Sequence, residues 1–322
     1  MPITVSAPGK LMLLGEHAVV YGNPCLVATV GQRLFMTVSK IDESILRIVS
    51  KAVGLVNYQK DLKNVGQGDI PRGARFVEGT VKHYFEIYKF KSGLQINIKS
   101  DFSPLYGFGS SSAVIVCTLY GLSILFNQPL TLRQLFDMSY QVVQEIEGLR
   151  SGFDIAAAIW GGCLYFIGNG KVIEPIQVND IPLIVGYSGI KADTPTQVAQ
   201  VANLKRRNPQ KTNRIFSEIN KLVEKAKIAI IQKNWKQFGI LMNSNQLFLR
   251  QLQVSTDKLE LLISTALKAG AWGAKLSGAG GGDCMIAVAA DDNKESVKLA
   301  ITQAGGQVIE VETNVIGVRL EN

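Results

Sequence analysis

Apolar and polar residues follow two different periods along this chain. They alternate at residues 27–38, 45–49 and 94–100, and such alternation predicts β-strands. Apolar residues recur at helical spacing in five longer segments, at residues 76–90, 131–146, 213–233, 234–249 and 256–269, which predicts amphipathic helices. The segment at 113–126 is apolar almost throughout, so we expect it to be a helix buried in a core.

The pattern changes near residue 180. A polar connection that contains proline precedes a new apolar strand at residues 181–187. A chain of 322 residues is long for one domain and comfortable for two. We therefore expect one domain over residues 1–180 and a second over residues 181–322.

A run of glycine and serine, GFGSSSA, occupies residues 107–113, directly before the buried helix. Gly107 and Gly109 allow tight, partly left-handed backbone turns. A helix start offers unpaired N–H groups and the positive end of the helix dipole, which favour phosphate. No lysine follows the second glycine, so a cation for a phosphate must come from elsewhere in the chain. The alternative is a simple glycine turn with a serine N-cap.

Two further glycine-containing stretches carry polar residues. A short strand is expected at residues 3–6, and the Pro-Gly pair after it predicts a turn that holds Lys10 at the mouth of an apolar strand. The run GEHAVVYG follows at residues 15–22. Near the C-terminus, KLSGAGGGDC at residues 275–284 has four glycines in five positions. Such a backbone comes very close to another group or turns very tightly.

Three other polar residues are candidates for a site, and two of them are open to two interpretations. Asp154 lies between a glycine turn and an alanine-rich helix, where an aspartate is commonly an N-cap. It could equally be a carboxylate aimed at a pocket under the glycine-serine run. His17 is either an ordinary capping or core histidine or a site residue, and with two histidines in the chain a His/Cys metal site is not indicated. Glu145 lies near the end of its predicted helix.

Composition narrows the possible partners. The chain is 47% hydrophobic and 19% charged, with a net charge of +8, so it can bury sizeable cores. Basic residues cluster at 205–207 without an aromatic RNA-binding pattern or a paired Cys/His finger, which argues against nucleic acid. We take the charge to favour small anionic substrates, with a solvated basic helix face as the alternative.

The cysteines and the apolar runs indicate the cellular compartment of the protein. Four widely spaced cysteines without a C-x-x-C pair predict a cytosolic protein free of disulfides. The N-terminus lacks the basic start and apolar core of a signal peptide. No run reaches the length of a membrane span. We therefore expect a cytoplasmic protein with no membrane partner; its oligomeric state stays open, with a homodimer as one option.

The three glycine-containing stretches resemble, in this order, the three motifs of the GHMP kinases, a family of small-molecule kinases. The first stretch looks like that of the mevalonate kinases within the family, because sugar kinases carry Asp-Tyr after Gly-Glu-His and this chain has Ala-Val-Val. The run GGGDC and the run SGFD before alanines look more like phosphomevalonate kinases. We give more weight to the first stretch, because in this family it lines the acceptor pocket.

This resemblance implies an α+β fold of two domains with the active site in the cleft between them. The N-terminal domain would be α/β and similar to ribosomal protein S5, and the C-terminal domain would be ferredoxin-like. The implied activity is phosphorylation of the mevalonate hydroxyl by ATP, with Mg²⁺, to give 5-phosphomevalonate. Phosphomevalonate or another small alcohol is the alternative acceptor. A non-catalytic nucleotide- or RNA-binding module is a distant alternative, because binding without turnover does not need Asp154.

The resemblance also implies roles for individual residues. Lys10 and Asp154 would be catalytic, with Asp154 orienting or deprotonating the hydroxyl and Lys10 stabilising the transferred phosphoryl group. Ser111 and Glu145 would ligate Mg²⁺. The residues implied to bind the nucleotide are Gly107, Gly109, Ser110, Ser111 and Ser112. Those implied to bind substrate are Lys10, Glu16, His17, Asp154 and Thr194. The glycine loop of the active site would comprise Gly278, Ala279, Gly280 and Gly281. Arg150 could bind the anionic end of either acceptor.

Overall fold

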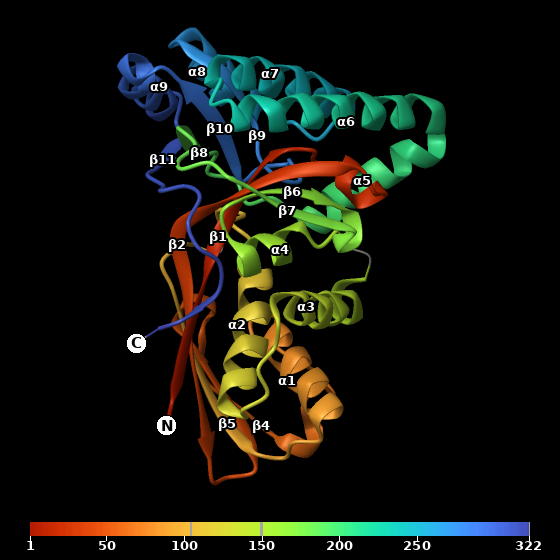
Figure 1. The fold of residues 1–322 in the computed structure, drawn as a ribbon, viewed down its shortest axis with the longest axis vertical. Helices are drawn as coiled ribbons and strands as arrows, with labels where there is room; N and C mark the ends of the chain where they lie inside the picture. The colour runs from red at the N-terminus through yellow and green to blue at the C-terminus, as the bar shows by residue number, and fades with distance from the viewer. Residues whose placement is uncertain (104, 149–150, 322) are drawn as a thin grey trace.

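The computed structural model describes residues 1–103, 105–148 and 151–321, and these contain two sheets with their own helices (Figure 1). In this described part of the chain, the first sheet has eight strands and the second has four. The first sheet comprises β1 (Ile3–Leu14), β2 (Pro24–Ile41), β3 (Ile45–Ser50), β4 (Leu55–Asp61), β5 (Gly93–Ser100), β6 (Cys163–Ile167), β7 (Val172–Ile176) and β12 (Arg319–Leu320). The second comprises β8 (Leu183–Tyr187), β9 (Ala271–Leu276), β10 (Cys284–Ala289) and β11 (Gln307–Ile309).

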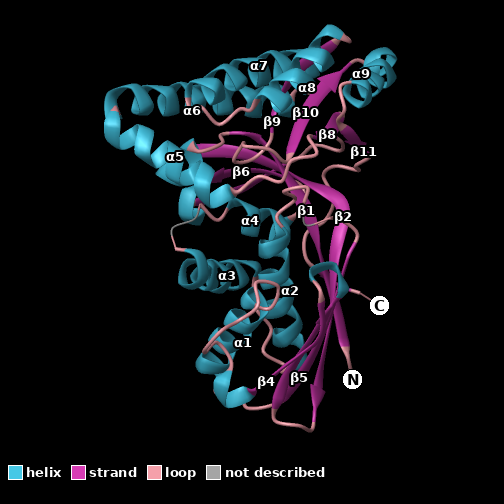
Figure 2. Ribbon diagram, turned by 180° about the vertical axis from the view of Figure 1, so that it is seen from behind, coloured by secondary structure: helices cyan, strands magenta, loops and turns pink. Residues whose placement is uncertain are grey.

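Helices lie against one face of the first sheet. They are α1 (Arg75–Tyr88), α2 (Ser110–Leu125), α3 (Leu132–Glu147) and α4 (Phe153–Trp160). Helix α2 packs directly on β1 and β2, while α1 and α3 pack on α2 (Figures 1 and 2). The central position of α2 explains its sequence, because a helix surrounded by protein is apolar on all sides. The prediction of a buried helix over 113–126 is confirmed.

The second sheet has the strand order β11-β8-β10-β9, all antiparallel. Numbered along the chain, this order is 4-1-3-2, with a helical connection between the first and second strands and another between the third and fourth. That is the ferredoxin-like βαββαβ arrangement, as expected. The first connection holds α5 (Thr194–Arg207), α6 (Pro209–Ile231), α7 (Trp235–Gln251) and α8 (Asp257–Lys268), and the second holds α9 (Asp291–Gln303).

The expected division at residue 180 falls just before β8. After β11, however, the chain returns to the first sheet, where β12 pairs with β1 and Glu321 donates its backbone N–H to Thr4. Both termini therefore lie beside the first sheet (Figure 1). The last residues of the second expected domain thus belong structurally to the first sheet.

One local expectation is wrong. The Pro-Gly pair predicted a turn after a short strand at 3–6, but β1 continues without a turn from Ile3 to Leu14. The pairing of β1 with β2 shifts register between Pro8 and Gly9. A β-bulge accommodates a proline within a strand, so the pair bends β1 where a turn was expected, and Lys10 lies within the strand.

In the part of the chain that the structure describes, every helix is too short or too polar to cross a lipid bilayer.

Candidate active site

The glycine-serine run forms the start of α2. Gly107 and Gly109 have φ of 72° and 82°, in the left-handed region where side chains are disfavoured. Gly109 is the N-cap residue of α2, and the helix begins at Ser110. The serine N-cap considered from the sequence is therefore not formed. Ser110, Ser111 and Ser112 are the first three residues of the helix, so their N–H groups are among those that a helix leaves free for a ligand.

Lys10 of β1 is bonded to this run through both its backbone and its side chain. Its backbone N–H donates to the Phe108 carbonyl at 3.0 Å, and its Nζ donates to the Gly107 carbonyl at 2.9 Å. The residue is 9% exposed. The cation that the glycine-serine run lacks is thus supplied by β1, about a hundred residues earlier in the chain.

Asp154 lies near Gly109, on the side where a Cβ would project. A Cβ placed on Gly109 would be 3.0 Å from Cε of Lys10 and 3.8 Å from Cβ of Asp154. Lys10 Nζ is also 5.5 Å from the centre of the Phe153 ring. Burial lowers the pKa of the Lys10 ammonium, and the carboxylates of Asp154 and Asp283 partly offset that effect. Lys10 and Asp154 therefore lie near each other beside the start of α2.

The position of Asp154 in α4 excludes the capping interpretation. Gly152 is the N-cap residue of α4, and Asp154 is the second residue of the helix. Its Oδ1 accepts a hydrogen bond from the N–H of Ile155 at 3.2 Å. A carboxylate in the first turn of a helix is favoured by the helix dipole. The cap of α4 does not depend on Asp154, because Gly152 is the N-cap residue.

Glu16 has a different environment from the one expected. It is 1% exposed, and both carboxylate oxygens are bonded to residues of the second domain. Oε1 pairs with the Lys275 ammonium, and Oε2 accepts from the Asn245 amide at 2.9 Å. The side chains of Glu16 and Lys275 are fully buried. Glu16 therefore joins the two domains, and its oxygens are already occupied in this structure.

His17 makes a second contact between the domains. Its Nε2 lies 2.9 Å from the carbonyl oxygen of Ala279; because a carbonyl only accepts, Nε2 carries the hydrogen. Burial lowers the pKa of His17. In the same region, the Ser277 hydroxyl donates to the Met12 carbonyl at 2.9 Å and accepts from the Met12 N–H at 3.0 Å. The first and third glycine-containing stretches are thus bonded to each other.

The third stretch is glycine-rich for steric reasons at two positions. A Cβ on Gly280 would be 2.1 Å from the Val254 carbonyl oxygen. One on Gly281 would be 2.5 Å from the Gln197 amide nitrogen, and Gly281 has a φ of 77°, which disfavours a side chain. A Cβ on Gly278 would meet nothing within 4 Å, but its φ is 97°. The loop of Gly278, Ala279, Gly280 and Gly281 is therefore held between α5 and the turn after α7.

Neither Glu145 nor Thr194 is brought to the start of α2 by any described contact. The Glu145 carboxylate is 61% exposed and lies 3.2 Å from Nδ1 of His83 on α1. Thr194 is exposed at the first residue of α5. Arg150 lies outside the described residues.

The chemistry of the proposed metal donors is suitable for Mg²⁺. Ser111 offers a hydroxyl and Glu145 an exposed carboxylate, both hard oxygen donors. Magnesium in kinases commonly takes one or two protein ligands and completes its shell with phosphate oxygens and water. The described residues contain no group of three or more His, Cys, Asp or Glu side chains that could hold a metal by themselves.

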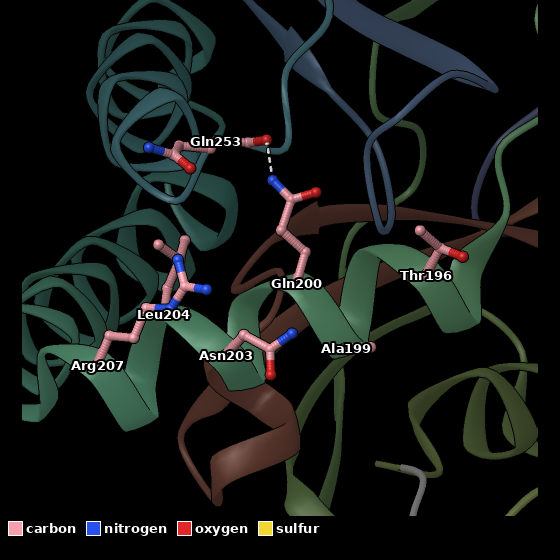
Figure 3. Close-up of a pocket in the computed structure, with 7 residues that line it drawn as sticks. All are labelled: Thr196, Ala199, Gln200, Asn203, Leu204, Arg207 and Gln253. Carbon is pink, nitrogen blue, oxygen red and sulfur yellow. Dashed lines mark hydrogen bonds between the residues drawn. The ribbon is translucent and has the colours of Figure 1, made fainter.

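A groove of about 350 Å³ lies elsewhere, between α5 and the turn after α7 (Figure 3). Gln200 crosses it and donates to the carbonyl of Gln253 at 2.7 Å. Its lining residues are Thr196, Ala199, Gln200, Asn203, Leu204, Arg207 and Gln253. Since Lys10, Asp154 and the start of α2 are not among them, we do not take this groove as the catalytic site.

Sequence reasoning missed the partners of Glu16. Lys275 is a charged residue within the buried strand β9, a position that costs free energy unless the charge is paired, and this signal could have identified it. Asn245 lies on α7 and is fully buried, but nothing in its sequence neighbourhood distinguishes it from other polar helix positions.

Comparison with known proteins follows the same division. A family model described as "GHMP kinases N terminal domain" matches residues 75–162, and one described as "GHMP kinases C terminal" matches residues 226–307. The "Mevalonate kinase" of Thermococcus sibiricus is 33% identical over 333 residues, covering 100% of this chain and 99% of the relative. The chain belongs to the GHMP kinase family. The resemblance inferred from the three motifs is confirmed, as is the two-domain fold.

Solved structures similar to this GHMP kinase confirm its fold but do not identify its substrate. A Methanococcus jannaschii mevalonate kinase superposes with a TM-score of 0.81 at 24% identity, covering 100% of this chain and 99% of the other. A Lactococcus lactis galactokinase complexed with galactose gives 0.87 at 19% identity, covering 99% and 95%. Proteins named for different acceptors thus share the fold of this GHMP kinase, so the acceptor must be argued from the site and the sequence relatives.

The buried pair between the domains gives a first prediction. Lys275→Met leaves the Glu16 carboxylate buried without its cation, so the free energy of unfolding should fall by about 3–5 kcal/mol. Chemical denaturation measures this change. The double variant Glu16→Gln/Lys275→Met buries no charge and should be more stable than Lys275→Met.

The matched control is Lys221→Met, which removes a lysine from the exposed pair with Glu218. Exposed pairs contribute about 0–1 kcal/mol, so this variant should unfold nearly like the wild type. Equal stabilities of Lys275→Met and Lys221→Met would contradict a structural role for the buried pair.

Proposed function

We propose that this protein transfers the γ-phosphoryl group of ATP to the hydroxyl of mevalonate, giving 5-phosphomevalonate. The observation that carries the proposal is that Lys10 and Asp154 both lie within 4 Å of the position that a Cβ on Gly109 would take, at the start of α2. It places a cation, a carboxylate and free helix N–H groups around one point. The name of the full-length relatives and the GEHAVVYG run support mevalonate as the acceptor.

Transfer requires positioning and neutralisation of charge more than covalent chemistry by the protein. The N–H groups of Ser110, Ser111 and Ser112 hold a phosphate of ATP. Asp154 accepts the proton of the acceptor hydroxyl as its oxygen bonds to the γ-phosphorus, and the bond from that phosphorus to the bridging oxygen breaks to release ADP. Lys10 balances the negative charge on the phosphoryl oxygens during this step.

Mg²⁺ would be held by Ser111 and Glu145 and would neutralise charge on the phosphate oxygens. For Glu145 this requires its exposed carboxylate to exchange the hydrogen bond with His83 for the ion. The protein's own contribution is then the fixed geometry of Lys10, Asp154 and the start of α2.

The remaining expected residues take two roles in this proposal. His17 and Thr194 lie on the first stretch and at the start of α5, and we propose that they contact the substrate. Glu16, whose oxygens are bonded to the second domain, positions the first stretch and does not bind the substrate directly. Residues 1–180 would supply the phosphate-holding and catalytic groups, and residues 181–322 the glycine loop that closes the site.

Phosphomevalonate is the second candidate acceptor. It is favoured by Asp283, which follows three glycines and lies against Gly107, the residue whose carbonyl accepts from Lys10; the run GGGDC resembles that of phosphomevalonate kinases. A cytoplasmic location and the option of a homodimer stay predictions; the four buried, free cysteines agree with a reducing compartment.

The acceptor is tested by steady-state kinetics with ATP and one alcohol at a time. Because differential transition-state binding sets kcat/KM, mevalonate should give the highest kcat/KM among mevalonate, phosphomevalonate, galactose and homoserine. If phosphomevalonate greatly outperforms mevalonate, the second candidate replaces the first.

The role of Asp154 is tested by Asp154→Asn. Asparagine keeps the shape and the hydrogen bond to Ile155 but loses basicity, so kcat should fall by about 10²–10⁴-fold, with ATP affinity and Tm little changed. The control Asp257→Asn alters a first-turn aspartate of α8 and should leave kcat unchanged. Lys10→Met acts on the same step, so the double variant should lose less than the product of the two single effects. Near-normal turnover of Asp154→Asn would remove the carboxylate from the mechanism.

The metal donors are tested by Ser111→Ala and Glu145→Gln. Each should raise the Mg²⁺ concentration needed for half-maximal activity without lowering Tm, because both side chains are partly or mostly exposed. Glu174→Gln, which alters an exposed pair with Lys227, is the control. An unchanged Mg²⁺ dependence in Glu145→Gln would mean that another acid ligates the metal.

A further inference from the structure

Asp283 is a buried aspartate with an unusual backbone at the end of the glycine-rich stretch. Its φ is 55°. Few residues other than glycine adopt such a positive φ, although aspartate does so more often than most. Its backbone N–H donates to the Ile190 carbonyl at 2.7 Å, and its carbonyl accepts from the Ser188 N–H at 2.9 Å. The glycine-rich stretch is therefore bonded at Asp283 to the segment that joins β8 to α5.

One oxygen of the Asp283 carboxylate holds that segment. Oδ1 accepts from the Ala192 N–H at 2.9 Å and from the Lys191 ammonium at 3.1 Å. The Asp283 side chain is 12% exposed, whereas that of Lys191 is 41% exposed. An ammonium has three N–H donors. One of them is engaged by Asp283, so the ammonium is tethered on its protein side while much of the side chain stays open to a ligand.

The other oxygen of Asp283 lies against the start of α2. Oδ2 is 2.3 Å from the position that a Cβ on Gly107 would take, so only glycine fits there. Gly107 is also the residue whose carbonyl accepts from the Lys10 ammonium. Asp283 of the second domain and Lys10 of the first thus contact the same glycine.

Lys191 is therefore held near the point where transfer takes place in the proposed function. The charge of Lys191 lowers the pKa of Lys10, and the charge of Asp283 raises it. The Lys10, Lys191, Asp154 and Asp283 side chains together carry no net charge, whereas a nucleoside triphosphate carries several negative charges at its phosphates. A tethered ammonium with free donors is suited to a phosphate oxygen.

We propose that Asp283 positions Lys191 so that its ammonium binds the terminal phosphate of ATP from the second domain, opposite Lys10. The terminal phosphate is favoured over the inner ones because Asp283, which holds Lys191, lies against Gly107, and the carbonyl of Gly107 accepts from Lys10, which in the proposed function lies beside the transferred group. Lys191 is a binding residue and Asp283 a positioning residue. The inference rests on the proposed use of ATP, but it does not depend on which alcohol is the acceptor.

The test is calorimetric titration of three ligands without turnover: a non-hydrolysable ATP analogue with Mg²⁺, ADP with Mg²⁺, and mevalonate. Lys191→Met should weaken binding of the ATP analogue by about 10-fold or more, since a charge-assisted hydrogen bond is lost. Binding of ADP, which lacks the terminal phosphate, should change by less than about 2-fold. Lys191→Arg should restore part of the affinity for the analogue.

Asp283→Asn tests the positioning role. Asparagine can still accept from Ala192 and Lys191 but no longer attracts the ammonium by charge, so the loss for the ATP analogue should lie between wild type and Lys191→Met. The combined variant should lose little more than Lys191→Met, because both act through one ammonium. Lys221→Met is again the matched control and should bind all three ligands like the wild type.

Three results would overturn the inference. Equal losses for the analogue and ADP would mean that Lys191 supports the fold of the site, and a loss confined to mevalonate would mean that it binds the acceptor. An unchanged affinity for the analogue would remove Lys191 from the site. If Asp283→Asn does not fold, the variants at the more exposed Lys191 still test whether its ammonium binds the terminal phosphate. Failure of the proposed function is distinguishable, since it appears as absent turnover of mevalonate or as a wild type that does not bind the analogue.

Discussion

The arrangement of the site depends on one buried ion pair between the two domains, Glu16 with Lys275. Neither side chain is accessible to water, so each charge depends on the other, and Asn245 satisfies the remaining carboxylate oxygen at 2.9 Å. A buried ion pair adds little net stability, because burying the two charges costs desolvation free energy. Separating the pair is nevertheless costly, because it leaves a buried charge without a partner, and this cost fixes the relative position of the two elements that carry the charges. Here the fixed arrangement is that of β1 relative to β9, which brings the first and third glycine-containing stretches together.

The glycines at the start of α2 leave room for charged side chains of both domains to come close to one another. The Gly107 carbonyl accepts from Lys10, and Asp283 occupies the space that a Cβ on Gly107 would take. Lys10 and Asp154 both lie within 4 Å of the Cβ position of Gly109. Any side chain at either glycine would fill the space in which these groups meet. The same absence of side chains leaves the N–H groups of the first turn of α2 accessible to a phosphate. Cation, carboxylate and backbone donors therefore converge without a lysine inside the loop.

Local patterns allowed much of the fold to be predicted from the sequence. The buried helix α2 and the strand β5 follow from their apolar patterns, and the second-domain helices α6 to α8 lie within a few residues of expectation. The continuous course of β1 was missed because Pro8-Gly9 has the composition of a turn, while pairing with β2 imposes a bulge. The return of β12 to β1 and the pairing of Glu16 with Lys275 join residues hundreds of positions apart, and no local pattern encodes such contacts.

The central claim is that Lys10 and Asp154 flank the point of transfer between two fixed domains. A crystal structure with mevalonate, Mg²⁺ and a non-hydrolysable ATP analogue tests this claim most directly. The acceptor hydroxyl should lie about 2.6–3.2 Å from the Asp154 carboxylate, with the Lys10 ammonium beside the terminal phosphate and the Glu16–Lys275 pair unchanged. An acceptor hydroxyl bound away from Asp154, or a terminal phosphate remote from Lys10, would contradict the account.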